Sequence, residues 1–296
     1  MADDLLSLSS SFPDATEADW LASAEKALKG RGLDAITRTT ADGLKIHPLY
    51  RESDFPSAND PRGTPGVAPF LRGASAAPDP YLPWDIRQTF THPSPETTNE
   101  EILRDLERGV SSVEIRLDCS GRTGVQITTP GDFNVALQGV NPEIATVALD
   151  HAAASGATAS ALLGLWATSQ GDASQLKLDF NMDPLGCLAR TGSLSGGLNP
   201  AFARLAEVSE QLGTSFPQAG LIRIDARMVH EAGGSEAQEL GALVASAVDT
   251  LRRLTNRTDI AGTAPRMSFA VALDANYGIG VAKLRAARRL WARCLD

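Results

Sequence analysis

The sequence predicts an α/β fold with a parallel sheet in its larger, C-terminal part. From residue 97 onward, strand-like apolar segments alternate with amphipathic helix-like segments. Repeated strand–helix–strand units of this kind place their strands parallel to one another. The alternation fits both an open, doubly wound sheet and a (β/α)8 barrel. No Gly-x-Gly-x-x-Gly motif follows the first predicted strand, so the nucleotide-binding form of the open sheet gains no support.

The N-terminal part has a different character. We predict one helix over residues 17–29, because its apolar residues recur at helical spacing and Gly30 stands where a C-terminal cap belongs. A hairpin with its turn at Asp42-Gly43 follows. Residues 53–83 are rich in Pro, Gly, Ala, Ser and Asp, which is typical of an extended arm.

The expected domains are an N-terminal helix and extended arm, residues 1–95, and a strand–helix domain, residues 96–296. Thr98 and Glu101 predict a capping box at the start of the first helix of the second domain. The strands are expected at residues 111–118, 124–129, 143–150, 175–181, 220–226 and 267–275. The helices are expected at residues 99–109, 132–139, 158–170, 199–213, 235–254 and 280–295. We expect the outer edges of the first and last strands to lack a partner strand within the chain.

Three of the predicted strands carry charged residues at alternate positions. One face of the sheet must therefore be apolar and packed under the helices, and the other must be polar. Buried charge is costly unless it is paired, so the opposite signs predict ion pairs across the strands. The alternative is that some of these residues lie in water at frayed strand ends. The charged residues are Glu114, Arg116, Asp118, Lys177, Asp179, Arg223 and Asp225.

Composition excludes several classes of protein. The net charge of -9 argues against a nucleic-acid-binding protein, which needs a basic face. No apolar run reaches the roughly 18 residues of a membrane span, and the acidic N-terminus lacks a secretory signal. Three scattered cysteines fit reduced thiols, so we expect a cytoplasmic protein. The four histidines show no metal-ligand spacing, and we expect no metal site.

Several blocks together resemble the methylmalonyl-CoA mutase family, in the order in which that family has them, and the resemblance covers roughly residues 17–295. The blocks are DGLKIHPLY (42–50), PGVAPFLRG (65–73), PWDIRQ (83–88), NEEILRDLERGVSSVEIRLD (99–118), HEAGGSEAQELG (230–241) and VAKLRAARRLWARCL (281–295). The resemblance implies a (β/α)8 TIM-type barrel, incomplete here with about six strands, behind an N-terminal extended arm. It also implies radical chemistry with adenosylcobalamin that interconverts methylmalonyl-CoA and succinyl-CoA, with CoA threaded along the barrel axis.

The sequence departs from the active pattern at the family's Arg-Pro-Trp-Thr-Ile-Arg-Gln-Tyr block. The leading arginine falls on Leu82, the threonine on Asp85 and the active-site tyrosine on Thr89. Arg87 and Gln88 persist, and the resemblance makes them candidates for substrate binding. A carboxylate at position 85 would repel a polyanionic ligand such as CoA.

A second group of departures lies further along the chain. The family's catalytic histidine falls on Met228, and His230 stands two residues beyond it. The family's glutamine after the fourth strand is shortened to Asn181, a third candidate for substrate binding. A substrate-binding arginine of the family falls on Thr191, with Arg190 adjacent. Long charged side chains paired on the inner face would also fill the barrel bore.

These departures predict a non-catalytic small subunit, the beta-type chain of a mutase heterodimer, or a fragment of one, within an isomerase family. We expect no catalytic residue and no cofactor in this chain, with Thr89 and Met228 at the lost positions. Adenosylcobalamin and the large catalytic subunit are expected in the assembly. The alternative is an active acyl-CoA mutase of altered specificity that works with a separate cobalamin-binding chain, through Arg87, Gln88, Asn181 and His230. An unrelated binding role also stays open.

Overall fold

The computed structural model describes residues 15–55, 63–77, 79–118, 120–151, 156–255 and 259–296. Contacts divide the chain into two compact units, Met1–Pro61 and Arg62–Asp296. The division that we expected after residue 95 stays a prediction. Strand β3 (Arg87–Phe90) nevertheless belongs to the sheet of the larger unit, because it pairs in parallel with β4 (Ser112–Leu117).

The smaller unit begins with the predicted helix, α1 (Glu17–Ala27). Thr16 caps the helix, since its side chain accepts a hydrogen bond from the Asp19 backbone while the Asp19 carboxylate accepts one from the Thr16 backbone. Gly30 has a φ of 79°, the left-handed conformation that ends a helix at low steric cost. The sequence therefore predicted both ends of this helix within about two residues.

The predicted hairpin is also present in the smaller unit. Its strands β1 (Arg38–Thr39) and β2 (Lys45–Ile46) pair antiparallel. Gly43 lies in the turn with a φ of 80°. Two 3-10 helices complete the unit, η1 (Leu33–Ala35) and η2 (Glu52–Asp54).

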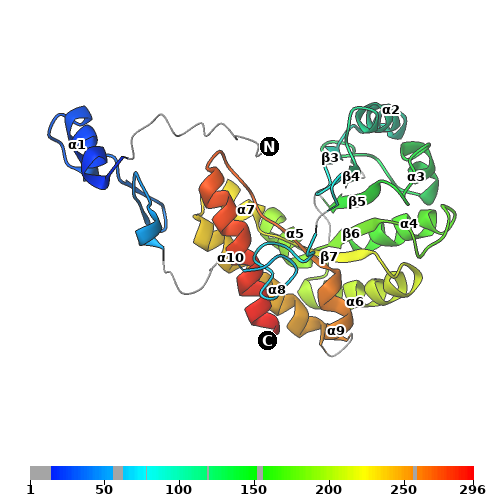
Figure 1. The fold of residues 1–296 in the computed structure, drawn as a ribbon. Helices are drawn as coiled ribbons and strands as arrows, with labels where there is room; N and C mark the ends of the chain where they lie inside the picture. Colours follow the sequence, from blue (N-terminus) through cyan, green and yellow to red (C-terminus); the bar gives the residue numbers. More distant parts are fainter. Residues whose placement is uncertain (1–14, 56–62, 78, 119, 152–155, 256–258) are drawn as a thin grey trace, which may run out of the picture. The chain divides into compact units, whose positions relative to one another are not determined.

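The larger unit is built on one six-stranded parallel sheet, whose strands follow one another in chain order from β3 to β8 (Figure 1). This curled half-barrel confirms the predicted α/β class and the incomplete TIM-type barrel. Its strands are β3 (Arg87–Phe90), β4 (Ser112–Leu117), β5 (Thr146–His151), β6 (Leu178–Met182), β7 (Gly220–Asp225) and β8 (Met267–Ala270).

Helices follow the strands, and α2, α3, α4 and α6 form a row along one side of the sheet (Figure 1). This is the arrangement that repeated strand–helix–strand units produce. Among the described residues, no helix is both long and apolar enough to cross a membrane. The helices are α2 (Pro95–Leu106), α3 (Pro130–Ala136), α4 (Ala157–Ala167), α5 (Pro184–Thr191), α6 (Leu198–Ser215), α7 (Arg227–Glu231), α8 (Glu236–Leu254), α9 (Ile260–Thr263), η3 (Ala264–Arg266) and α10 (Tyr277–Leu295).

One strand prediction was wrong, at residues 124–129. This segment forms only an isolated bridge between Val125 and Leu117, although Val125 and Ile127 are buried as a strand pattern would require. The reason is that β5 lies along one side of β4 and β3 lies along the other as far as Ile115, so only the end of β4 is left for Val125. The edge of residues 111–118 that we expected to be unpaired is therefore covered by β3.

The predicted capping box at Thr98 and Glu101 was also wrong. Helix α2 begins earlier, at Pro95, and the side chain of Ser94 accepts a hydrogen bond from the Thr97 backbone. Proline is favourable in the first turn of a helix because that position needs no backbone donor. Thr98 lies inside the helix and is buried, and its hydroxyl donates to the His92 carbonyl.

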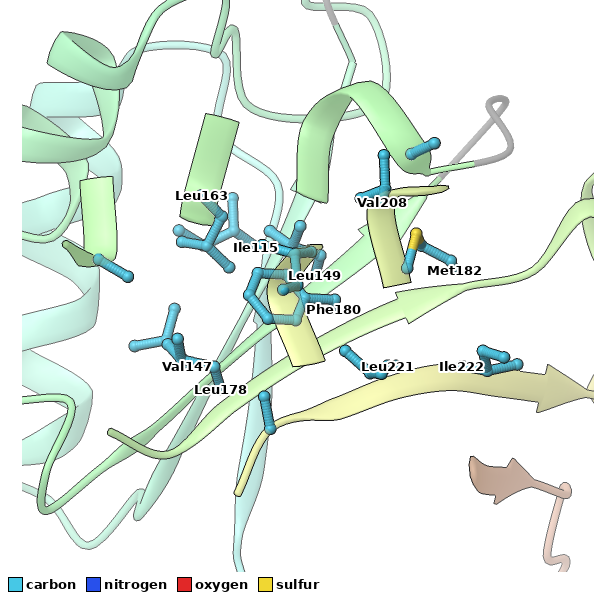
Figure 2. Packing of buried hydrophobic residues seen from close by; sticks show 14 of the residues in the cluster. Ile115, Val147, Leu149, Leu163, Leu178, Phe180, Met182, Val208, Leu221 and Ile222 are labelled. Atoms are coloured by element: carbon cyan, nitrogen blue, oxygen red, sulfur yellow. The ribbon is translucent and has the colours of Figure 1, made fainter. Parts of the chain in front are cut away.

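The hydrophobic core lies between the sheet and the helix row. Figure 2 shows Ile115, Leu149 and Phe180 from three neighbouring strands packed beside Leu163 of α4. Phe180 is fully buried, and its ring stands 6.0 Å from the ring of Phe216. Close packing of this kind makes the apolar face of the sheet the main stabilising surface of the larger unit.

Replacing Phe180 with alanine should lower the free energy of unfolding by about 3–5 kcal/mol, because it leaves a cavity in a packed core. Urea denaturation of the full chain measures this. Leu165→Ala is the control, because Leu165 is 60% exposed on α4 and should change stability by less than about 0.5 kcal/mol. Equal effects at the two positions would contradict the assigned core.

Candidate functional site

The polar face of the sheet carries ion pairs that join strands distant in sheet order. Arg223 of β7 lies centrally: its Nη1 is 2.5 Å from Glu114 Oε1 on β4, and its Nη2 is 3.3 Å from Asp150 Oδ1 on β5. Arg116 of β4 donates to the other oxygen of Asp150, at 2.8 Å. These four side chains form the Arg223 network.

A second ion pair on this face joins Arg87 of β3 to Asp179 of β6. The Arg87 Nη2 lies 2.5 Å from Asp179 Oδ2, and its Nε donates to the Ser112 hydroxyl at 2.8 Å. The hydroxyl of Thr89 donates to Glu114 Oε2 at 2.8 Å, which connects β3 to the Arg223 network.

Both ion pairs require the sheet to curl. β4 and β7 are three strand positions apart, and so are β3 and β6. Neighbouring strands are about 4.8 Å apart, so three steps across a flat sheet would separate the backbones by about 14 Å. Arginine and a carboxylate reach one another over that interval only when the sheet bends around them. The ion pairs therefore lie inside the curve.

The predicted network of ion pairs is confirmed for most of the charged residues, and two behave differently. Asp118 follows β4 and accepts hydrogen bonds from Ser120 and Thr123 in its own loop. Lys177 precedes β6, and its ammonium donates to the Ile144 carbonyl. Both residues lie just outside a strand, where side chains no longer face the strands opposite.

A pocket of about 320 Å³ opens at the carboxyl ends of these strands. Asp225, the last residue of β7, forms a two-point ion pair with Arg227 at 2.6 and 2.9 Å and also contacts Arg190 at 3.4 Å. Burial raises the pKa of the Asp225 carboxyl, but the hydrogen bonds and charge of Arg227 outweigh it, so the pKa falls below its usual range. The lining residues are Arg116, Thr123, Asp150, Arg190, Asp225, Arg227, Met228 and Glu231.

Two buried titratable residues contact residues that line this pocket: Asp183 contacts Asp225, and His151 contacts Arg190. The Asp183 carboxylate caps α5 by accepting a hydrogen bond from the Gly186 backbone N–H, and it accepts another from the Asp225 backbone N–H. Burial raises the pKa of Asp183 to about 6. His151, at the end of β5, contacts the Phe180 carbonyl through Nε2, and burial lowers its pKa to about 4.

The structure brings only part of the predicted site together. Met228 lines the pocket, and Arg87 and Thr89 lie on the inner face. Gln88 is exposed, and its amide donates a hydrogen bond to the Thr89 carbonyl beside it. Asn181 is buried with a φ of 53°, and its amide donates to the Leu149 carbonyl at 2.9 Å, away from the pocket lining. The substrate-binding roles of Arg87, Gln88 and Asn181 stay predictions.

Sequence reasoning missed the residues that form the pocket rim, Arg227 and Glu231 among them. The available signal was the pair of aspartates at the ends of two strands, Asp150 and Asp225. Parallel strands end at the same edge of a sheet, so these carboxylates had to meet there. The two arginines that pair with Asp225, Arg190 and Arg227, come from helices α5 and α7, and strand periodicity says nothing about those positions.

A cluster of possible metal ligands lies in the larger unit as well. The donor atoms of His230, Glu236 and Glu239 lie within 4.8 Å of one another. The ammonium group of Lys283 contacts both glutamates and donates to the Ala272 carbonyl at 2.6 Å. This lysine supplies the positive charge that the carboxylates need, so the arrangement has the chemistry of a buried ion-pair cluster joining α8 and α10.

Comparison with known proteins gives a consistent result. The family profile described as Methylmalonyl-CoA mutase matches residues 39–296. The methylmalonyl-CoA mutase small subunit of Streptomyces virginiae is 37% identical over 307 residues, covering 100% of this chain and 47% of that protein. The small subunit of Propionibacterium freudenreichii subsp. shermanii is 32% identical, covering 97% of this chain and 45% of that protein.

The human mitochondrial methylmalonyl-CoA mutase is more distant, at 26% identity over 94% of this chain and 39% of its own length. The chain thus spans about half the length, or less, of the curated relatives that it matches.

Replacing Arg223 with alanine should lower the free energy of unfolding by about 3–5 kcal/mol, because Glu114 and Asp150 would keep buried charges without their shared partner. The double variant Arg223→Met with Glu114→Leu should regain part of the loss, since it removes both members of one pair. Denaturant unfolding measures both. A single variant as stable as the wild type would contradict the burial of this network.

The raised pKa of Asp183 gives a pH dependence of definite sign. Its folded value of about 6 exceeds the ordinary 3.8, so the folded chain holds the proton more tightly than the unfolded chain. The protonated Asp183 side chain therefore contributes to the free energy of unfolding below pH about 4, and this contribution is lost as the pH rises through about 6. The stability of the wild type relative to Asp183→Asn should therefore fall over that interval in urea unfolding. A constant difference would refute the assignment.

Proposed function

Because the chain belongs to the methylmalonyl-CoA mutase family, we propose that it is a non-catalytic small subunit of an adenosylcobalamin-dependent methylmalonyl-CoA mutase. It supports a large catalytic chain that interconverts methylmalonyl-CoA and succinyl-CoA, and the two chains form a heterodimer in the cytoplasm. The match of nearly this whole chain to part of two bacterial proteins named as small subunits supports this role.

The Arg223 network is the observation that carries the proposal. Its side chains converge from β4, β5 and β7 inside the curl of the sheet. In the family the pantetheine arm of CoA passes along this axis, as the resemblance implies. A ligand could enter here only by breaking buried ion pairs, and uncompensated buried charges cost about 3–5 kcal/mol. The network thus favours a barrel that is filled by its own side chains.

The residues at the family's reacting positions also favour a non-catalytic role. The Thr89 side chain is short, and its hydroxyl donates a hydrogen bond to Glu114. Met228 carries no titratable group and cannot transfer a proton. Asp85 adds a negative charge at the other end of the sheet, where its carboxylate accepts from the hydroxyls of Ser111 and Thr146. CoA is a polyanion, so this charge opposes its binding.

The two histidines at the carboxyl ends of the strands, His151 and His230, do not fit the cofactor. A cobalt ligand needs an accessible imidazole nitrogen, but His151 is buried and its Nε2 is committed to the Phe180 carbonyl. His230 stands beside two carboxylates that already hold Lys283. In this proposal adenosylcobalamin is bound by the catalytic chain, and this chain contributes no cofactor ligand.

The pocket at the carboxyl ends of the strands favours one alternative, an acyl-CoA mutase chain of altered specificity that works with a separate cobalamin-binding chain. Its rim carries Arg190 and Arg227, whose guanidinium groups could bind an anionic acyl group. Both arginines already share the carboxylate of Asp225, which reduces the charge that they offer to a ligand. The alternative is therefore the weaker of the two.

The isolated chain mixed with adenosylcobalamin and methylmalonyl-CoA should form no succinyl-CoA above background. An interaction made mainly in the transition state contributes several kcal/mol, and the chain lacks both the tyrosine and the histidine of the family pattern. Chromatographic detection of succinyl-CoA measures this. Addition of the large mutase subunit of the source organism should yield turnover.

Two controls distinguish the candidates. Visible absorption spectra of adenosylcobalamin should stay unchanged when the isolated chain is added. Arg190→Ala in this chain should leave the turnover of the heterodimer unchanged. Succinyl-CoA formation by this chain with a separate cobalamin-binding chain, abolished by Arg190→Ala, would establish the alternative.

A further inference from the structure

Helix α10 is attached to the larger unit differently from the other long helices in the described part of that unit. Helices α2, α4, α6 and α8 each bury apolar side chains against the core. The side chain that α10 buries is that of a lysine, Lys283, and the apolar side chains of this helix stay at least partly exposed. Burial of apolar surface, which usually stabilises a helix in a protein, therefore contributes less to α10 than to these helices.

Lys283 has its partners in two other segments. Its ammonium group forms ion pairs with Glu236 and Glu239 of α8, beside which α10 lies, and donates to the Ala272 carbonyl at 2.6 Å (Figure 1). The Ala272 N–H donates to the other oxygen of Glu239 at 2.7 Å. The side chains of Lys283 and Glu239 are 2% and 0% exposed. These four residues, the Lys283 cluster, join α10 to α8 and to the segment that follows β8.

The apolar contact between α10 and β8 is weaker. The ring of Trp291 stands 4.9 Å from the ring of Phe269, in an edge-to-face arrangement. Both side chains are only partly buried, and Leu290 and Leu295 of the same helix are 42% and 49% exposed. A partly exposed aromatic pair contributes less free energy than is lost when a buried ion pair loses one partner. The Lys283 cluster is therefore the main attachment of α10.

We infer that α10 is a strap that opens from α8 and β8 as one unit, and that the Lys283 cluster determines how often it opens. A carboxylate buried without its partner is strongly unfavourable, so the contacts of Lys283 are lost together and the helix opens in one step. Opening uncovers Phe269, while the core between the sheet and the helix row stays packed. Elements with little buried apolar surface open locally at a lower free energy than the whole domain.

Hydrogen exchange of the full-length chain, followed by mass spectrometry in increasing urea, tests this inference. Amides of residues 277–295 should exchange together and faster than those of α4. Their rates should depend little on urea below the unfolding transition, because the opening exposes little surface. The α4 amides should show a steep dependence, since their exchange requires global unfolding. The same rate and the same urea dependence in α10 and α4 would overturn the inference.

The variant Lys283→Met keeps the aliphatic stem of the side chain and removes its charge. It should raise the exchange rate of the α10 amides at least about a hundredfold, as expected when a buried ion pair loses one partner. Addition of Glu239→Gln should restore part of the protection, because it removes a buried charge and keeps an acceptor for the Ala272 N–H. The matched control is Arg288→Met, at an exposed position of the same helix, and it should exchange as the wild type does.

Three results would contradict the role of the Lys283 cluster. The first is wild-type exchange of α10 in Lys283→Met, and the second is an equal effect of Arg288→Met. The third is a double variant that exchanges no more slowly than Lys283→Met, because the loss would then come from packing of the lysine stem. Tryptic cleavage within α10 gives an independent measure, since a protease needs the opened helix. It should be faster in Lys283→Met by a similar factor, and equal cleavage rates would also overturn the inference.

Discussion

The contact between Arg223 and Glu114 is the constraint on which the larger unit depends. It joins β7 to β4 across the inside of the sheet, although two strands lie between them in sheet order. Such a contact exists only where the sheet curls, and the curl in turn removes both charges from water. The pair is therefore both a consequence of the barrel-like geometry and a condition for it. Asp150 adds a second carboxylate to the network and accepts hydrogen bonds from Arg223 and Arg116.

The same constraint is the main support for the proposed non-catalytic role. A bore that admits CoA needs small side chains that need not pair across the sheet. Here the inner face is held by charges that satisfy one another, and the two ends differ in character. One end opens into a pocket of arginines and aspartates, and the other presents the Asp85 carboxylate between two hydroxyls. A filled axis needs no bound substrate to stabilise it, which agrees with the role proposed above.

The two units differ in how they obtain stability. The larger unit buries an extensive apolar cluster between its sheet and its helices (Figure 2). The smaller unit relies on local devices, such as the Thr16 cap and the ion pair of Arg51 with Glu17, while its apolar side chains stay in contact with solvent. Local hydrogen bonds can define a conformation, but they contribute far less than burial of apolar surface. The described part of the smaller unit thus keeps its local conformation without a buried apolar core.

The sequence by itself determined the α/β class, most of the helices and five of the six strands, because periodicity and capping residues are local properties. It also determined that the inner face would be charged, since Glu114 and Arg223 alternate with apolar neighbours. Only the tertiary structure decided which charges pair, because a pairing across three strand positions depends on curvature that no local pattern records. It likewise decided that β3 pairs with β4 while Val125 adds only a bridge, because β5 and β3 leave free only the end of β4 beyond Ile115.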